Sequence, residues 1–139
     1  MDLRPQHRID TDVLVIGGGA TGVAAACTAA RAGLSVLLVE RYGFCGGGAV
    51  AGLSGTICGL YEAAEGPVKP RQLVHGFVDD FIAQMESRNG LTGPLLYGKT
   101  FTRVHEPLAW RESADALLAA AGVRVLYHAL ATGVHRDGD

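Results

Sequence analysis

Apolar positions in the first third of the chain alternate between strand-like runs and a helix-like segment. Residues 12–16 form a nearly unbroken apolar run that ends in three glycines, which is typical of a parallel strand buried on both faces. Small residues over 22–31 favour a closely packed helix, and Gly33 stands where a C′ glycine would end it. Residues 35–40 form a second apolar run. We therefore predict a βαβ unit with two parallel strands over 12–40.

The pattern changes after this unit. Glycines and prolines crowd residues 41–70 and predict a loop-rich segment that faces a ligand. Over 74–85 the apolar residues recur at helical spacing, while polar residues fall on the opposite side. This spacing predicts an amphipathic helix, beginning with Val74 on its apolar face, that ends near residues 89–90.

The remainder of the chain is predicted to form a third helix followed by strands. Pro107 lies in the first turn of this helix, whose apolar face includes Trp110, and Gly122 is expected to stop it. A strand is expected directly afterwards, over 123–128. Residues 134–139 are typical of a strand that runs into an Asp-Gly hairpin turn.

Composition narrows the classes of partner. The 139 residues are 48% hydrophobic and 19% charged and include 20 glycines, which suits one globular domain, or a large part of one, with demanding turns. Twelve basic and 14 acidic residues leave a formal charge of −2, and the basic residues are scattered, so we expect no nucleic-acid partner. No apolar run has the length of a signal-peptide core or a membrane span. Three cysteines without CxxC spacing indicate neither a disulfide framework nor a zinc site, so a cytoplasmic location is expected.

A glycine-rich loop follows the first predicted strand. Residues 17–22 satisfy the GxGxxG pattern, which is a weak signal by itself in a glycine-rich chain. Here the loop also opens a helix, and the next strand ends in Glu40, 23 residues beyond Gly17. This spacing predicts a dinucleotide site in which Glu40 accepts hydrogen bonds from ribose hydroxyls and disfavours a 2′-phosphate.

Each residue of the loop has its own predicted task. Gly17 permits the tight turn, Gly19 lets the backbone approach a pyrophosphate, and Gly22 lets the helix pack closely on the strand. Ala20 and Thr21 lie in the first turn of the helix. The free N–H groups and the partial positive charge of that turn are expected to hold the phosphates.

A second glycine cluster, Gly46, Gly47 and Gly48, begins six residues after Glu40. A plain NAD fold has no evident use for it. A second surface made of backbone alone would suit a cofactor that lies extended along the strand ends, as FAD does.

These residues resemble the glutathione-reductase-type FAD-binding fold and the FAD-dependent oxidoreductases that contain it. The resemblance implies an α/β fold, a Rossmann-like parallel sheet that is incomplete here, over 11–139 after a polar tail at 1–10. The residues that carry it are 12–22, 40–41, 46–48, 58–59 and 106–126.

The resemblance also implies roles for individual residues. Gly17, Gly19 and Gly22 would line the pyrophosphate, and Glu40 would hold the adenosine ribose. Gly46, Gly47 and Gly48 would lie beside the pyrophosphate and the ribityl chain. Arg41 would flank the adenine, and Ala131 would contact it through its backbone.

The implied function is that of an FAD-binding oxidoreductase portion, in which the flavin transfers hydride or electrons to or from a small-molecule substrate. Members of this family run far beyond 139 residues, so we expect an N-terminal portion. Two alternatives remain open: an NAD-binding or nucleotide-sensing module without catalysis of its own, and an incompetent fragment that needs a partner. A homo-oligomer and a complementary chain are the partner types considered.

Thiols and imidazoles offer few further candidates. Cys45 lies in the loop expected near the flavin, but small-residue packing accounts for it better than redox chemistry does. Cys27 is expected in the core. The histidines lack the spacing of metal ligands, so no metal site is predicted.

Overall fold

The computed structural model describes residues 7–63 and 68–136. Its first unit is a three-stranded parallel sheet of order β1-β2-β6. The strands are β1 (Val13–Ile16), β2 (Val36–Val39) and β6 (Arg124–Leu126). Helix α1 (Ala20–Arg31) connects β1 to β2, and helix α3 (Pro107–Ala121) leads into β6. This confirms the predicted α/β class and the parallel βαβ unit.

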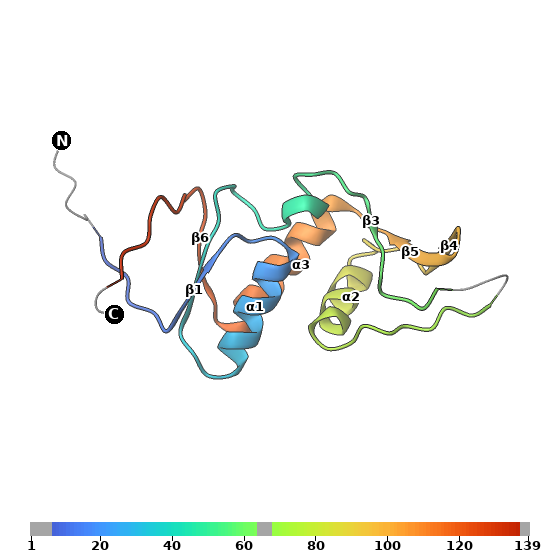
Figure 1. Ribbon diagram of the computed structural model, residues 1–139, viewed down its shortest axis with the longest axis horizontal. Helices are drawn as coiled ribbons and strands as arrows, with labels where there is room; N and C mark the ends of the chain where they lie inside the picture. Colours follow the sequence, from blue (N-terminus) through green and yellow to red (C-terminus); the bar gives the residue numbers. More distant parts are fainter. Residues whose placement is uncertain (1–6, 64–67, 137–139) are drawn as a thin grey trace.

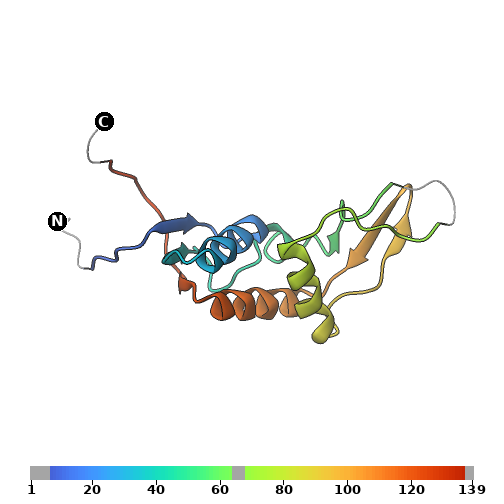
Figure 2. The same cartoon turned by 90° about the horizontal axis from the view of Figure 1, so that it is seen from below.

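The second unit, at the other end of the elongated molecule, is an antiparallel sheet of order β3-β5-β4 (Figure 1). It consists of β3 (Thr56–Ile57), β5 (Thr100–Val104) and β4 (Leu95–Tyr97). Helix α2 (Phe77–Ser87) lies between the two sheets, and a short 3₁₀ helix η1 (Gly47–Ala49) follows β2 along the chain. Figure 2 shows the helices in the middle and one sheet at each end.

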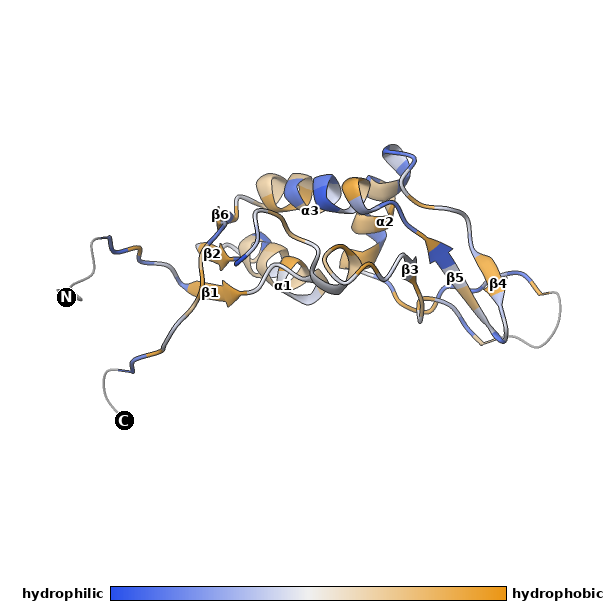
Figure 3. Cartoon of the chain, turned by 90° about the horizontal axis from the view of Figure 1, so that it is seen from above, coloured by the Kyte–Doolittle hydropathy of each residue, from blue (hydrophilic) through white to orange (hydrophobic). Residues whose placement is uncertain are grey.

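One face of the parallel sheet carries the main hydrophobic core. Val36 and Leu38 point to this face and are 2% and 0% exposed, packed with buried residues of α1 and α3. The opposite face is exposed at the edge strand: Leu14 and Ile16 of β1 are 53% and 56% exposed, whereas Leu37 of the central β2 is 8% exposed. The prediction that the first strand is buried on both faces is therefore wrong, because β1 lies at an edge and both helices cover the same side (Figure 3).

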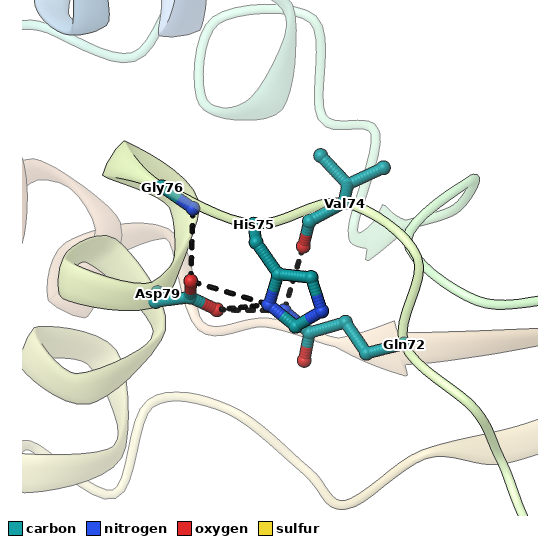
Figure 4. A network of polar contacts seen from close by, with 5 residues as sticks. All are labelled: Gln72, Val74, His75, Gly76 and Asp79. Atoms are coloured by element: carbon teal, nitrogen blue, oxygen red, sulfur yellow. Dashed lines mark hydrogen bonds and ion pairs between the residues drawn. The ribbon is translucent and has the colours of Figure 1, made fainter.

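Helix α2 begins later than its apolar spacing predicts. Gly76 precedes it with φ +96°, and the backbone N–H of Gly76 donates to the Asp79 carboxylate at 2.9 Å. Figure 4 shows that this carboxylate also accepts hydrogen bonds from the side chains of Gln72 and His75. Val74 consequently lies before the helix and is 44% exposed, contrary to its predicted place on the apolar face.

The C-terminal part also differs from expectation. Strand β6 is shorter than the predicted 123–128, and His128 has φ +54°, which is incompatible with an extended strand. Residues 134–136 form no strand, and the Asp-Gly turn falls outside the described residues. Among the helices that the structure describes, none has the length and apolar character needed to cross a membrane.

Candidate functional site

In the turn from β1 into α1, backbone atoms of neighbouring segments lie in close contact. Gly17 has φ +99°, and its N–H donates to the Val39 carbonyl at 2.8 Å, which ties the end of β1 to β2. A Cβ on Gly22 would lie 1.9 Å from the Gly17 carbonyl oxygen. The turn thus requires glycine at both ends of the motif. The sequence predicts this task for Gly17, whereas for Gly22 it predicts close packing of the helix on the strand.

The N-terminus of α1 differs chemically from those of the other two helices. Glu106 caps α3 by accepting from the Ala109 N–H, and α2 has Asp79 and Asp80 in its first turn. At α1, the N-cap is Gly19, no side chain caps the helix, and its first turn contains no acidic residue. This end therefore offers backbone N–H groups and a partial positive charge to an anion.

The second glycine cluster lies directly against the first. The N–H of Gly46 donates to the carbonyl of Gly18 at 2.8 Å. A Cβ on Gly47 would lie 2.9 Å from the Cα of Gly19, whereas a Cβ on Gly48 would meet nothing within 4 Å. The structure thus brings the two predicted phosphate-facing loops together, and their contact leaves no room for a side chain at Gly47.

Glu40 lies at the junction of these loops and is 6% exposed. One carboxylate oxygen accepts the N–H of Gly18 at 2.6 Å, and the other accepts the N–H of Tyr42 at 2.8 Å. A carboxylate oxygen has more than one lone pair, so each can accept a further hydrogen bond. The backbone therefore fixes the orientation of Glu40 without using up its capacity for a ribose hydroxyl.

A cavity of about 150 Å³ opens beside this carboxylate. Two hydrogen bonds hold the segment after β6 beside the end of β2: the Ala129 N–H donates to the Glu40 carbonyl at 3.0 Å, and the His128 N–H donates to the Tyr42 carbonyl at 3.1 Å. The cavity therefore joins the ends of β1 and β2 to the segment after β6. It is lined by Ile16, Gly17, Val39, Glu40, Arg41, Ala129, Leu130 and Ala131.

Four residues predicted from the sequence meet in this cavity: Gly17, Glu40, Arg41 and Ala131. Ala20 and Thr21 instead line a larger cavity of about 450 Å³, on the side of α1 that faces α2 and Trp110. Their backbone N–H groups belong to the first turn of α1, but their side chains do not contribute to the small cavity. Sequence reasoning missed Tyr42, whose backbone holds both Glu40 and the 128–131 segment.

The thiol nearest the glycine loops is structural. Cys45 is 0% exposed, and a Cβ on Gly18 would lie 2.5 Å from its sulfur. Burial raises the pKa of the Cys45 thiol to about 11, despite a contact of 3.6 Å with the Tyr127 hydroxyl. Such a thiol is protonated at neutral pH and is a poor nucleophile. Within residues 7–63 and 68–136, no group of three or more His, Cys, Asp or Glu side chains could hold a metal ion.

Comparison with known families agrees with this geometry. The family model "FAD dependent oxidoreductase" matches residues 12–139. The chain belongs to this family. As a family member it contains the Rossmann-like portion in which β1, α1 and β2 form the dinucleotide-binding unit.

Curated relatives match over a short part of the chain. An uncharacterised protein of Mycobacterium tuberculosis is 53% identical over 45 residues, which are 32% of this chain and 8% of that protein. Urocanate reductase of Eggerthella lenta is 55% identical over 38 residues, which are 27% of this chain and 6% of the reductase. These alignments thus span less than a tenth of each relative.

Solved structures extend the likeness of fold to most of the chain. A geranylgeranyl bacteriochlorophyll reductase-like protein of Thermoplasma acidophilum has a TM-score of 0.57 at 21% identity, covering 91% of this chain and 32% of that one. THI4 of Thermovibrio ammonificans has a TM-score of 0.51 at 18% identity, covering 84% and 38%. At these identities the comparison establishes the fold.

Proposed function

We propose that this chain binds FAD and forms the cofactor-binding portion of an oxidoreductase that acts on a small molecule. The observation that carries the proposal is the junction of the two glycine loops beside the uncapped N-terminus of α1. Gly19 and Gly47 meet there with no side chain between them, and Glu40 and Arg41 border the adjoining cavity. A dinucleotide needs these features in this order: a ribose acceptor, a backbone surface for two phosphates, and a continuation beyond them.

The size of the small cavity supports an assignment of the parts of the cofactor. A cavity of about 150 Å³ is smaller than the roughly 300–1,000 Å³ of ordinary ligand pockets, so it accepts one end of a dinucleotide and not the whole. Ala131 and Arg41 border this end and are suited to an adenine, and Glu40 to its ribose. The N–H groups of the first turn of α1 would hold the pyrophosphate.

When bound, FAD supplies hydride or electron transfer at its isoalloxazine ring. The residues of this chain bind and orient: Glu40 accepts ribose hydroxyls, and the two glycine loops exclude side chains from the phosphate path. The buried, protonated Cys45 stays outside the chemistry.

The test is retention of flavin by the purified chain. Wild type, Glu40→Gln and Glu62→Gln are mixed with FAD, separated from the excess by gel filtration, and examined for the visible absorbance of flavin. Glu62 is the matched control because its carboxylate pairs with Arg71 at the surface, at 2.7 Å. We expect wild type and Glu62→Gln to retain flavin and Glu40→Gln to lose most of it, with circular dichroism confirming that all three are folded.

Failure has a defined meaning. A wild-type chain that retains no flavin, while binding NAD with an affinity that depends on Glu40, would replace the proposal by a nicotinamide-nucleotide module. Equal retention of flavin by wild type and Glu40→Gln would remove Glu40 from the site. Titration with ADP, which lacks the flavin, distinguishes a loss of binding at the adenosine end from a loss of binding at the isoalloxazine ring.

A further inference from the structure

Four side chains form a continuous stack from the small cavity to helix α3. The guanidinium of Arg41 lies 4.6 Å from the ring centre of Tyr42, and the guanidinium of Arg111 lies 4.6 Å from that of Phe44. Between them, the two rings are stacked with centroids 5.4 Å apart and planes 7° from parallel. Each ring of the stacked pair therefore has one guanidinium over it, and the ring quadrupoles attract these cations.

The stack ends at the adenosine cavity on one side. Arg41 lines that cavity, and its guanidinium also donates to the Tyr42 hydroxyl at 2.9 Å. The stack ends in the core layer on the other side, because Phe44 packs against the main hydrophobic cluster and Arg111 belongs to α3. A long, rigid helix thus supports a loop residue at the cavity.

Tyr42 transmits this support to the rest of the cavity. Its N–H donates to the Glu40 carboxylate at 2.8 Å, and its carbonyl accepts the N–H of His128 at 3.1 Å. The ring of His128 in turn packs on the intervening loop residue: a Cβ on Gly43 would lie 2.7 Å from its Nε2 atom. Fixing the Tyr42 ring therefore fixes the backbone groups that aim Glu40 and carry the 129–131 wall.

We infer that Arg111 and Phe44 are positioning residues for the adenosine end of the cofactor. Neither lines the cavity. Through Tyr42 and Arg41 they hold Glu40 and Arg41 in the orientation that accepts ribose and flanks adenine. This inference rests on the proposed function for the identity of the ligand. It predicts that affinity for the adenosine half depends on α3, which is far from the glycine motif in sequence.

The experiment compares FAD, ADP and FMN as ligands of wild type, Phe44→Leu, Phe44→Tyr and Arg111→Met. FMN lacks the adenosine half, and Phe44→Tyr keeps an aromatic face. The matched control is Arg31→Met, since Arg31 also lies over a ring, that of Phe77 at 5.8 Å, but away from the cavity. Phe44→Leu and Arg111→Met are expected to weaken binding of FAD and ADP about two- to fivefold and to leave FMN unchanged. Phe44→Tyr and the control should match wild type.

A second readout needs no ligand. Hydrogen exchange of the Tyr42 and Gly18 amides reports the two hydrogen bonds to Glu40, and both amides should exchange faster in Phe44→Leu and Arg111→Met than in wild type. Unchanged exchange would overturn the inference, as would an equal loss of affinity for FMN and FAD. If wild type binds neither FAD nor ADP, the proposed function fails, while the exchange measurement still decides whether α3 positions Glu40.

Discussion

Two glycines of the site differ in what an added methyl group would meet. A Cβ on Gly22 would overlap the Gly17 carbonyl oxygen at 1.9 Å, so Gly22→Ala should force the turn and α1 apart and destabilise the fold by about 1–3 kcal/mol. A Cβ on Gly48 meets nothing within 4 Å. Gly48→Ala should therefore unfold like wild type in denaturant and yet retain less FAD, because the new methyl group enters the path expected for the phosphates. Normal flavin retention by a stable Gly48→Ala would place Gly48 outside the site.

The three cysteines should differ in reactivity toward an aromatic disulfide reagent. Cys58 is exposed, whereas Cys27 and Cys45 are 0% exposed, and burial raises the pKa of both. We expect one thiol per chain to react quickly at neutral pH and the other two only after denaturation. Cys58→Ser should abolish the fast phase and Cys45→Ser should not. If the fast phase instead disappears in Cys45→Ser, the Cys45 thiol is reactive and a redox role for it has to be reconsidered.

His105 has a buried imidazole ring whose nitrogens lack hydrogen-bond partners among the described residues. It is 5% exposed, its ring lies 4.7 Å from that of Trp110, and neither ring nitrogen forms a hydrogen bond within the residues that the structure describes. Burial lowers its pKa below the ordinary 6.5, while the backbone and carboxylate of Glu106 act to a smaller extent in the opposite direction. Protons therefore bind better to the unfolded chain, and stability should fall as pH drops below about 6.5.

Replacing this ring tests the argument. His105→Phe keeps an aromatic contact with Trp110 and removes the unsatisfied nitrogens, so its stability at neutral pH should equal or exceed that of wild type. Between neutral pH and pH 5, wild type should lose stability more steeply than the variant in urea titrations. Parallel curves for the two proteins would show that His105 does not titrate differently on folding.

At the scale of elements, the start of α2 depends on a single carboxylate. Asp79 accepts the Gly76 N–H at 2.9 Å and the Gln72 amide at 2.8 Å, and the backbone bond is the main reason that its pKa is lowered. Asp79→Asn should lower the melting temperature more than Asp80→Asn, which removes the same charge from the same turn without a backbone bond. The difference should be present above pH 3.8, the ordinary pKa of the side chain, and vanish as pH falls through the lowered value.

Elements defined by local pattern were predictable, whereas those defined by distant partners were not. The run at 12–16, the small-residue helix and the run at 35–40 lie next to one another in sequence, and the structure confirms them as β1, α1 and β2. Strands β4 and β5 were missed. β4 is exposed along its length, and β5 contains the buried Arg103, whose guanidinium binds Glu86 of α2 and the carbonyl of Thr92. That this arginine belongs to a buried strand position can be recognised only from the contact between α2 and β5 in the folded structure.

The residues of the site also separate into those set by local sequence pattern and those set by distant contacts. Glu40 and the glycines follow from motif spacing, and Ala131 was placed by resemblance, but the role of Tyr42 depends on hydrogen bonds to residues on either side of the cavity. The stack with Arg111 joins positions about seventy residues apart, and no local pattern reveals such a contact.

At the scale of the whole molecule, the described residues leave apolar side chains of both edge strands exposed on one face of the parallel sheet. Leu14, Ile16 and Leu126 are 53%, 56% and 45% exposed and lie on the face opposite α1 and α3. Parallel sheets are normally covered on both faces, and contiguous exposed apolar surface promotes association. We therefore expect the isolated chain to self-associate through this face as its concentration rises.

A pair of double variants distinguishes association through this face from non-specific association through other exposed apolar residues. Leu14→Ser/Ile16→Thr should shift the chain toward monomer in sedimentation velocity, because it replaces the two most exposed apolar side chains of the face while leaving the core-facing Val13 and Val15 in place. Leu95→Ser/Leu96→Thr, on the antiparallel sheet, makes the same chemical change at residues that are 49% and 46% exposed. Association that survives the first variant and disappears in the second would assign the contact to the β3-β5-β4 sheet. Association lost only in the first would show that the contact is made by the exposed face of the parallel sheet. Because Ile16 also lines the small cavity, flavin affinity would then be measured on the wild-type chain at concentrations where it is monomeric.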